Sequence, residues 1–282
     1  MAATSMKDIK LRIKSVESTM QITKAMQLVA TSKLRRAKER MELSRPYADI
    51  ARQAVLTASI SCDDPSVPYL KKQDDKKACY IIIAGERGLA GGYNNNLFKA
   101  QLAHAEGREY CVLPIGRKAI EKYTRVGVPL LSDEYAGVEG LSVSRCYRIA
   151  GMLLDQFREG AFGDLYLVYT SFKTMMSQEV EIVQLLPVLP EEGLKKEKPV
   201  STVYDPGAQE VLEKIMPDYL AGTLYSAVCN SFLSEVASRR SAMDSATKNA
   251  GEMIGELKLR FNRARQGAIT QAITEIVAGA EQ

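Results

Sequence analysis

The sequence has 282 residues, 46% of them hydrophobic and 26% charged, with a formal net charge of +4. This is the composition of a soluble folded protein, long enough for one large domain or two ordinary ones. It excludes a membrane-spanning chain, because no apolar run approaches the ~20 residues that cross a bilayer. The first residues also lack the apolar stretch of a secretory signal.

Five cysteines are scattered along the chain without any CxxC pair. Their odd number and wide spacing argue against a disulfide framework or a zinc site, so we expect plain thiols in a reducing compartment. The one histidine, His104, lies in a helical pattern with no second histidine or cysteine nearby, and we expect no metal binding or catalysis from it. The cysteines are Cys62, Cys79, Cys111, Cys146 and Cys229.

A long coiled-coil helix is predicted at the start of the chain, over residues 1–60. Residues 4–58 contain no glycine, and their only proline, Pro46, marks a place where the helix could bend. Apolar residues recur in steps of three and four, which makes the narrow seam of a coiled coil. The seam positions are Ile9, Ile13, Val16, Met20, Leu34, Ala37 and Met41.

This predicted helix is strongly basic, with twelve basic side chains and five acidic ones in residues 1–60. Two interpretations are open: a solvated helix face, or a surface for nucleic acid, an anionic membrane or an acidic protein. The absence of interleaved aromatic residues weakens the case for single-stranded nucleic acid. The densest group, called the basic cluster below, consists of Lys33, Arg35, Arg36, Lys38 and Arg40.

An α/β domain is predicted over residues 78–205, after a linker at 61–77 that contains two prolines and many charges. Strand-like and helical segments alternate, which favours a mostly parallel, Rossmann-like sheet of about five strands. The last strand should lie at an edge, because Pro187 cannot donate a ladder hydrogen bond. The predicted strands cover residues 78–84, 109–115, 128–131, 165–170 and 179–189.

A glycine-rich loop, Gly85–Asn94, follows the first predicted strand and opens a helix. This is a suitable setting for phosphate binding through backbone amides, but the spacing matches neither GxGxxG nor GxxxxGK[ST]. The alternative is a tight turn in which glycine provides backbone freedom. The glycines concerned are Gly85, Gly88, Gly91 and Gly92.

A second coiled-coil helix is predicted over residues 206–282, beyond a polar linker at 190–202, with a local break at Pro217. Two long helices with narrow seams on either side of a globular insert most simply pack as an antiparallel coiled coil. Its seam is predicted to contain Met253, Leu257, Phe261, Ala264, Ala268, Ala272 and Ile276.

The end of this second helix, residues 265–280, is unusually apolar for a chain terminus. Such a helix end is either docked in its own core or held inside a partner, and in a coiled coil that projects beyond its head only the second fits. No catalytic constellation accompanies these features, which counts against an enzyme.

Three stretches resemble the gamma subunit of F-type ATP synthases, and the resemblance covers the whole chain. The first contains Ile22-Thr23-Lys24-Ala25-Met26, Val29-Ala30 and Ser32-Lys33-Leu34. The second is the Gly85–Asn94 loop, similar to the family pattern S-[ED]-[RK]-G-L-C-G-[GS]-[FY]-N. The third contains Ala242-Met243, Ala246-Thr247-Lys248-Asn249-Ala250, Arg263, Arg265-Gln266, Ile269-Thr270 and Gly279-Ala280.

The resemblance implies a bacterial rotor shaft without a catalytic site or cofactor of its own. Its coiled coil would turn inside a ring of alpha and beta subunits, and its foot would meet epsilon and the membrane c-ring, at the cytoplasmic face of the cell membrane. No nucleic acid is implied. The glycine loop would be structural, and the basic cluster would belong to the foot or lower shaft. The implied contacts with the ring are Lys24, Met26, Arg265, Gln266, Thr270 and Glu275.

Three positions depart from the family pattern. Ala90 stands where the loop usually has cysteine, a small-for-small change. Arg240 replaces a usual methionine, so an apolar shaft contact is in question, and Ala272 replaces a usual glutamate, so one carboxylate contact with the ring is missing or relocated. No cysteine-bearing insertion of the chloroplast type is present.

Two rival functions remain open at this stage. A nucleotide-binding α/β enzyme that uses the Gly85–Asn94 loop would be protected from thermal unfolding by its ligand. A helical hairpin that binds nucleic acid through the basic cluster would show affinity that falls steeply with salt.

Overall fold

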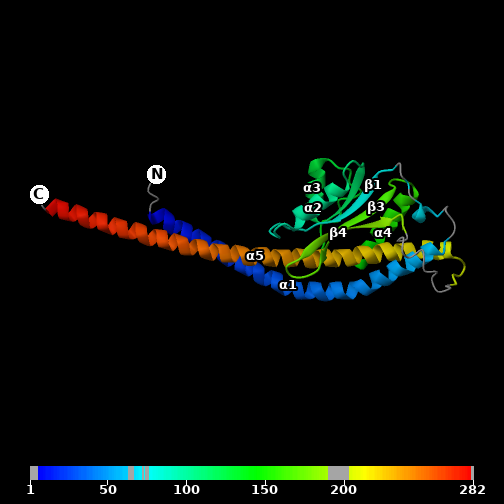
Figure 1. Cartoon of the computed structure of the whole chain (residues 1–282), viewed down its shortest axis with the longest axis horizontal. Coiled ribbons are helices and arrows are strands. Elements are labelled where there is room, and N and C mark those ends of the chain that lie inside the picture. The colour runs from blue at the N-terminus through cyan, green and yellow to red at the C-terminus, as the bar shows by residue number, and fades with distance from the viewer. Residues whose placement is uncertain (1–5, 63–66, 72, 74–75, 190–202, 281–282) are drawn as a thin grey trace. The chain divides into compact units, whose positions relative to one another are not determined.

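The structure is a computed structural model that describes residues 6–62, 67–71, 73, 76–189 and 203–280 (Figure 1). It divides into two compact units, which we describe one at a time. The hairpin unit consists of Met1–Thr31 and Arg239–Gln282, and the sheet unit of Ser32–Ser238. In chain order, the elements are α1 (Met6–Ile60), the short 3-10 helix η1 (Pro68–Leu70), β1 (Ala78–Ile83), α2 (Tyr93–His104), β2 (Tyr110–Ile115), α3 (Arg117–Val126), α4 (Val143–Arg158), β3 (Asp164–Phe172), β4 (Gln178–Leu186) and α5 (Ala208–Ala280).

The described strands form one mixed, mostly parallel sheet with the order β2-β1-β3-β4. Strand β1 pairs in parallel with both β2 and β3, and β3 and β4 form an antiparallel hairpin. The predicted edge position of the last strand is confirmed, although β4 ends at Leu186, just before Pro187. The sheet has four strands and not about five, because residues 128–131 contribute only an isolated bridge between Leu130 and Val112.

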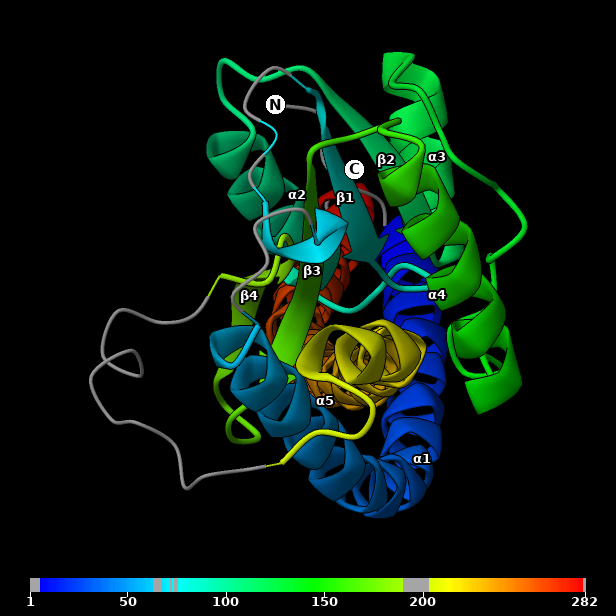
Figure 2. The ribbon, with the colours of Figure 1, turned by 90° about the vertical axis from the view of Figure 1, so that its right-hand side faces the viewer.

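Both faces of the sheet are covered, as Figure 2 shows from one end of the molecule. All six residues of β1 are buried, which explains why this strand reads as a continuous apolar run. On one face, Cys79, Ile81 and Ile83 share an apolar core with α4, the first part of α5 and the end of α1. On the other face, Tyr80 and Ile82 pack with α2 and α3. The alternation predicted from sequence therefore yields a layered α/β domain.

Local sequence signals fix several element ends. The Ser142 side chain caps α4 by accepting a hydrogen bond from the Arg145 amide at 3.4 Å. Gly127 ends α3 in the left-handed conformation, with φ 76°. At Gly116, φ is 95°, and a Cβ atom would come within 2.1 Å of the Ala84 carbonyl oxygen, so only glycine lets β2 turn here beside the end of β1.

The segment predicted as the 61–77 linker contains residues that pack into the core. Val67 and Tyr69 are almost completely buried, and the Tyr69 ring stacks on Phe157 of α4 with centroids 6.3 Å apart. The Val188 amide also donates to the Tyr69 carbonyl at 2.7 Å. This part of the segment is therefore held in the sheet unit by apolar burial. The sequence did not indicate this, because the two buried residues lie among many charged ones.

Within the sheet unit, α1 and α5 contribute to the same apolar core as the sheet. Val55 and Ala58 of α1 are fully buried there, together with a row of residues along α5. The predicted break at Pro217 is wrong, because α5 continues through this residue. Buried Met216 and Leu220 on either side hold the helix against the core, and this packing offsets the hydrogen bond that proline cannot make.

The hairpin unit is an antiparallel pair of helical segments, as predicted. The Oγ1 atoms of Thr23 and Thr247 lie 2.8 Å apart, and Gln27 donates to Asp244 at 2.8 Å. From the first contact to the second, the residue number rises on α1 and falls on α5, so the two helices run antiparallel. The buried seam residues of this unit are Ile9, Thr23, Ala30, Met243, Ala250, Ile254 and Leu257.

The predicted seam of the second helix needs correction. Met253 is 44% exposed, and Ile254 occupies the buried position in its place. A regular alternation of three and four residues from Ala250 reaches Ile254 and Leu257, so Met253 falls one residue off the inward face. Beyond Ala264, the predicted seam residues Ala268, Ala272 and Ile276 are all exposed.

Candidate functional site

The end of α5 carries exposed apolar side chains. Every residue from Arg265 to Val277 is exposed, including Ile273 at 56% and Ile276 at 71%. Soluble proteins seldom leave a contiguous apolar stripe uncovered, and such a stripe marks a site for a partner. Within the described chain the stripe is not docked in a core. This stripe, residues 265–277, is called the α5 tip below.

The four predicted contact residues of the α5 tip differ in whether their side chains form hydrogen bonds within the chain. Thr270 donates to the Gln266 carbonyl at 3.0 Å, and Gln271 donates to the Glu275 carboxylate at 2.9 Å. The side chains of Arg265 and Gln266 form no hydrogen bond or ion pair with the described residues. These two side chains are therefore available to a partner.

On α1, the predicted contact residues are Lys24, which is exposed, and Met26, which is half-buried. Four exposed apolar residues of α1 were not predicted as contacts: Ile22, Leu28 and Val29 close to Lys24 and Met26, and Leu11 nearer the start of the helix. The signal was present, because these apolar residues fall outside the three-and-four spacing of the seam. They extend the candidate contact surface of the hairpin unit along α1.

The basic cluster does not act as one surface. Arg35 pairs with Glu39 at 3.2 Å and Lys38 with Glu42 at 3.7 Å, both along the exposed face of α1. Arg36 is exposed and makes no hydrogen bond or ion pair with the described part of the chain. Exposed pairs of this kind contribute little to stability, about 0–1 kcal/mol each.

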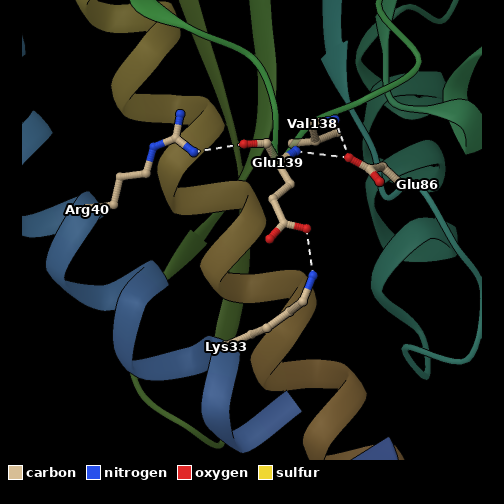
Figure 3. A network of polar contacts seen from close by, with 5 residues as sticks. All are labelled: Lys33, Arg40, Glu86, Val138 and Glu139. Atoms are coloured by element: carbon tan, nitrogen blue, oxygen red, sulfur yellow. Dashed lines mark hydrogen bonds and ion pairs between the residues drawn. The ribbon is translucent and has the colours of Figure 1, made fainter. Parts of the chain in front are cut away.

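The other two members of the cluster bind a loop of the sheet unit, residues 137–141 (Figure 3). Lys33 forms an ion pair with the Glu139 carboxylate at 2.6 Å. Arg40 donates to the carbonyl oxygens of Glu139 at 2.8 Å and Leu141 at 2.9 Å. Their charges are therefore matched by intrachain contacts. These contacts could not be predicted from the sequence, because Glu139 is more than a hundred residues away from Lys33.

Arg40 also contacts α5. Its Nε atom donates to the Tyr225 hydroxyl at 2.9 Å, and its guanidinium lies 5.1 Å from the centre of that ring. Burial alone lowers the pKa of Arg40, but the hydrogen bond to Tyr225 and the nearby thiols of Cys229 and Cys146 raise it, and the net shift is upward. Arg40 therefore stays charged while it joins α1, α5 and the 137–141 loop.

The glycine loop has the geometry of a structural turn. Leu89 and Gly91 adopt positive φ values of 63° and 56°, and the Gly85 amide donates to the Asn94 side chain at 2.9 Å. A Cβ atom at Gly85 would lie 2.9 Å from the carboxylate of buried Glu235. With the first amide occupied and a carboxylate beside it, the loop presents an unfavourable site for phosphate.

The other loop glycines and the three positions that depart from the family pattern lie in different environments. Gly92 lies at the N-cap of α2, and a Cβ atom at exposed Gly88 would meet nothing within 4 Å. Ala90 is buried, which suits a small side chain. Arg240 is half-buried, and its Nε atom has no hydrogen-bond partner among the described residues. Ala272 is exposed on the α5 tip.

Solved structures of ATP synthases contain chains with this fold. The rotor of the Euglena gracilis mitochondrial ATP synthase matches with a TM-score of 0.68 at 16% identity, over 94% of this chain and 98% of that chain. The central stalk and c-ring structure of Tetrahymena thermophila matches with a TM-score of 0.58 at 24% identity, over 80% and 99%. The chain therefore shares the fold of these structures: long terminal helices and an α/β insert.

Sequence comparison identifies the family. The family model described as ATP synthase matches residues 5–282. The ATP synthase gamma chain of Ruminococcus albus is 45% identical over 96% of both chains, and that of Lachnoclostridium phytofermentans is 41% identical over 98% of both. This chain belongs to the family of ATP synthase gamma chains. Among its described residues, no helix combines the length and apolarity that crossing a membrane requires.

Proposed function

We propose that this chain is the rotating central-stalk subunit of a bacterial F-type ATP synthase, without a catalytic site of its own. The observation that carries the proposal is the α5 tip, whose apolar side chains are exposed in a chain that matches gamma chains over nearly its full length. A ring of alpha and beta subunits that encloses the tip would remove this apolar surface from water.

The proposed mechanism is mechanical coupling. Ion flow would turn the c-ring and this shaft, and the uneven faces of the shaft would bias each beta subunit among its conformations in turn. Such a bias requires contacts whose free energy differs between beta conformers, because uniform binding shifts no equilibrium. Arg265 and Gln266 suit this role, since their polar groups are unbonded at the edge of an apolar surface.

The proposed partners are the alpha and beta subunits of the catalytic ring, the epsilon subunit and the c-ring. The complex would lie at the cytoplasmic face of the cell membrane, with this chain peripheral. Lys24, Met26, Thr270 and Glu275 complete the proposed ring contacts. We assign residues 1–60 and 206–282 to the shaft helices and residues 78–205 to the α/β domain, of which 1–5, 190–202 and 281–282 lie outside the described residues.

The basic cluster divides into two proposed roles. Arg35, Arg36 and Lys38 would face acidic loops of a partner, because they lie on the exposed side of α1. Lys33 and Arg40 would hold the shaft to the α/β domain, because their charges are matched by the 137–141 loop. The glycines of the Gly85–Asn94 loop would have a structural role only.

Reconstitution tests the proposal. The alpha and beta subunits of the Ruminococcus albus enzyme are mixed with this chain, and ATP hydrolysis is measured after size-exclusion chromatography. We expect co-elution and a large stimulation of hydrolysis, with no hydrolysis and no ATP-induced thermal shift for the isolated chain. A variant that ends at residue 264, and thus lacks the tip, is the control. Equal stimulation by both forms, or no co-elution of the full chain, would refute the proposal.

A further inference from the structure

The middle of α1 is held by polar contacts, whereas α5 is held by an apolar core. In the sheet unit, Leu212, Met216 and Leu220 of α5 are buried in the core beneath the sheet. Between residues 32 and 48, the buried positions of α1 are all small, at Ala37, Ser44 and Ala48. Small residues bury little apolar area, so polar contacts contribute a larger share of the free energy that orients this part of α1.

Those polar contacts come from the 137–141 loop. Arg40 donates hydrogen bonds to the carbonyl oxygens of Glu139 and Leu141. Lys33 pairs with the Glu139 carboxylate, and Figure 3 shows both contacts to Glu139. The same two side chains also contact α5: Arg40 bonds to Tyr225, and the Lys33 ammonium lies 5.9 Å from the centre of the Phe232 ring. The loop therefore restrains α1 at two points, two helical turns apart, next to α5.

Glu86 fixes this loop. Its Oε1 atom accepts hydrogen bonds from the backbone amides of Val138, at 2.5 Å, and Glu139, at 2.9 Å. The side chains of Val138 and Leu141 also anchor the loop in the core, whereas a Cβ atom at Gly140 would meet nothing within 4 Å. Glu86 therefore adds a polar restraint on the backbone amides to the apolar packing of the loop. A carboxylate that accepts from two successive amides is a strong, directional restraint.

Glu86 is itself held firmly. It follows Gly85, whose amide donates to Asn94 at 2.9 Å and whose carbonyl accepts from the Lys118 amide at 3.0 Å. The glycine loop is thus braced against α2 and α3 on the far face of the sheet. A continuous series of contacts therefore runs from the sheet through Glu86 and the 137–141 loop to α1.

We propose that Glu86 is a positioning residue that sets the orientation of α1 in the sheet unit, and with it the torsional stiffness of the rotor. The second half of this inference rests on the proposed function. The Gly85–Asn94 loop then has a mechanical purpose: it carries one carboxylate to the segment that holds the shaft helix.

Hydrogen exchange of the free chain tests the first half. The variant is Glu86→Gln, which keeps the size of the side chain and removes its charge. The matched control is Glu106→Gln, at an exposed position with no hydrogen bond or ion pair to the described chain. We expect at least tenfold faster exchange at the amides of Val138 and Glu139, a smaller increase in residues 33–40, and no change in the control. Unchanged exchange at 138 and 139 would overturn the proposal.

Rotation of the assembled complex tests the second half. A bead is coupled to a cysteine introduced at exposed Lys99, the ring is fixed, and the angular variance of the stalled rotor is recorded. We expect Glu86→Gln and Arg40→Lys each to raise the variance at least twofold, with Glu106→Gln unchanged. Because both act on one series of contacts, the double variant should not exceed the larger single effect by more than a small margin.

The outcomes separate the two proposals. A parent complex that assembles but does not rotate refutes the proposed function, and hydrogen exchange still decides the role of Glu86. A parent that rotates, with unchanged variance in both Glu86→Gln and Arg40→Lys, overturns the stiffness claim. If Glu86→Gln does not fold, Arg40→Lys carries the test in both experiments, since it keeps a positive charge but cannot reproduce the three guanidinium bonds.

Discussion

The ring of Tyr47 on α1 lies so close to Gly222 of α5 that a Cβ atom at position 222 would come within 2.7 Å of it. The Tyr47 hydroxyl lies 3.1 Å from that of Tyr147 on α4, and Tyr147 donates to Asp218 of α5. Three helices therefore meet through Tyr47, Tyr147 and the α5 residues Asp218 and Gly222. A cavity of about 300 Å³ opens beside them, lined by Leu43, Ser44, Tyr47, Val143, Tyr147, Gly222 and Tyr225.

Gly222→Ala should destabilise the chain despite the better helix propensity of alanine. The substitution gains about 1 kcal/mol of propensity, but overpacking against the Tyr47 ring costs about 1–3 kcal/mol. We expect a net loss of about 1 kcal/mol in the free energy of unfolding, measured by thermal unfolding followed by circular dichroism. Tyr47→Ala in the same chain should remove the clash, so that Gly222→Ala becomes neutral or stabilising in that background.

Gly255→Ala is the matched control for this prediction. Gly255 also lies on α5, but a Cβ atom there would meet nothing within 4 Å. The propensity gain should therefore appear alone, as a stabilisation of about 0.5–1 kcal/mol. Similar losses at positions 222 and 255 would contradict the steric explanation.

Thr23 and Thr247 should behave as a coupled pair in the hairpin unit. Their hydroxyls lie 2.8 Å apart, and each can also donate to a carbonyl of its own helix. Changing either one to valine should cost about 0.5–1 kcal/mol, because the remaining hydroxyl loses a partly buried partner. The double valine variant should be more stable than the sum of the singles by about 0.5–1.5 kcal/mol, since valine keeps the shape. Strict additivity in denaturant unfolding would contradict this coupling.

The cysteines should differ sharply in reactivity. Cys62 is partly exposed, while the other four are buried. Burial raises the pKa of Cys146 to about 12 and also raises that of Cys229, and the thiolate is the reactive form. Alkylation by iodoacetamide at pH 8, followed by mass spectrometry, should modify Cys62 and leave the four buried thiols intact until urea unfolds the chain. Rapid modification of Cys146 in the folded chain would contradict its placement.

The same shift predicts a loss of stability in alkali. The folded chain keeps the Cys146 proton up to about pH 12, whereas an unfolded thiol releases it near pH 9. The stabilisation is therefore complete below about pH 9 and is lost as the pH rises toward 12. Cys146→Ala should lower the stability at neutral pH and flatten this alkaline slope, measured as the urea midpoint from pH 8 to pH 10.5. An unchanged slope would show that other groups cause it.

Gln266→Ala addresses the proposed contacts of the α5 tip. If Gln266 finds a desolvated partner only in some beta conformers, its loss acts on barriers between rotary states. A rise of about 1.4 kcal/mol in one barrier corresponds to roughly tenfold slower ATP turnover. The unfolding midpoint of the isolated chain should not change, because Gln266 is exposed. Turnover at the parental rate, or a defect explained by unassembled complexes, would argue against this role.

The sequence alone determined the features that depend on periodicity. Steps of three and four predict both long helices and their antiparallel pairing, because a narrow apolar seam is stable only against a second one. Alternating strand and helix patterns predict the layered sheet, since each element must bury one apolar face. The family followed from three motifs that keep their spacing along the whole chain.

Only the tertiary structure showed which basic side chains form ion pairs and hydrogen bonds with distant residues of the same chain. In the sequence, Lys33 and Arg40 look like Arg35 and Arg36, because all four are basic residues on one helix. The difference comes from Glu139, which the fold brings to Lys33 across a separation of 106 residues. Electrostatic and hydrogen-bond energies depend on distances of a few ångströms in space, and residue spacing along the chain does not encode such long-range contacts. For the same reason the role proposed for Glu86 could not be predicted, because the glycines around it indicate only a turn.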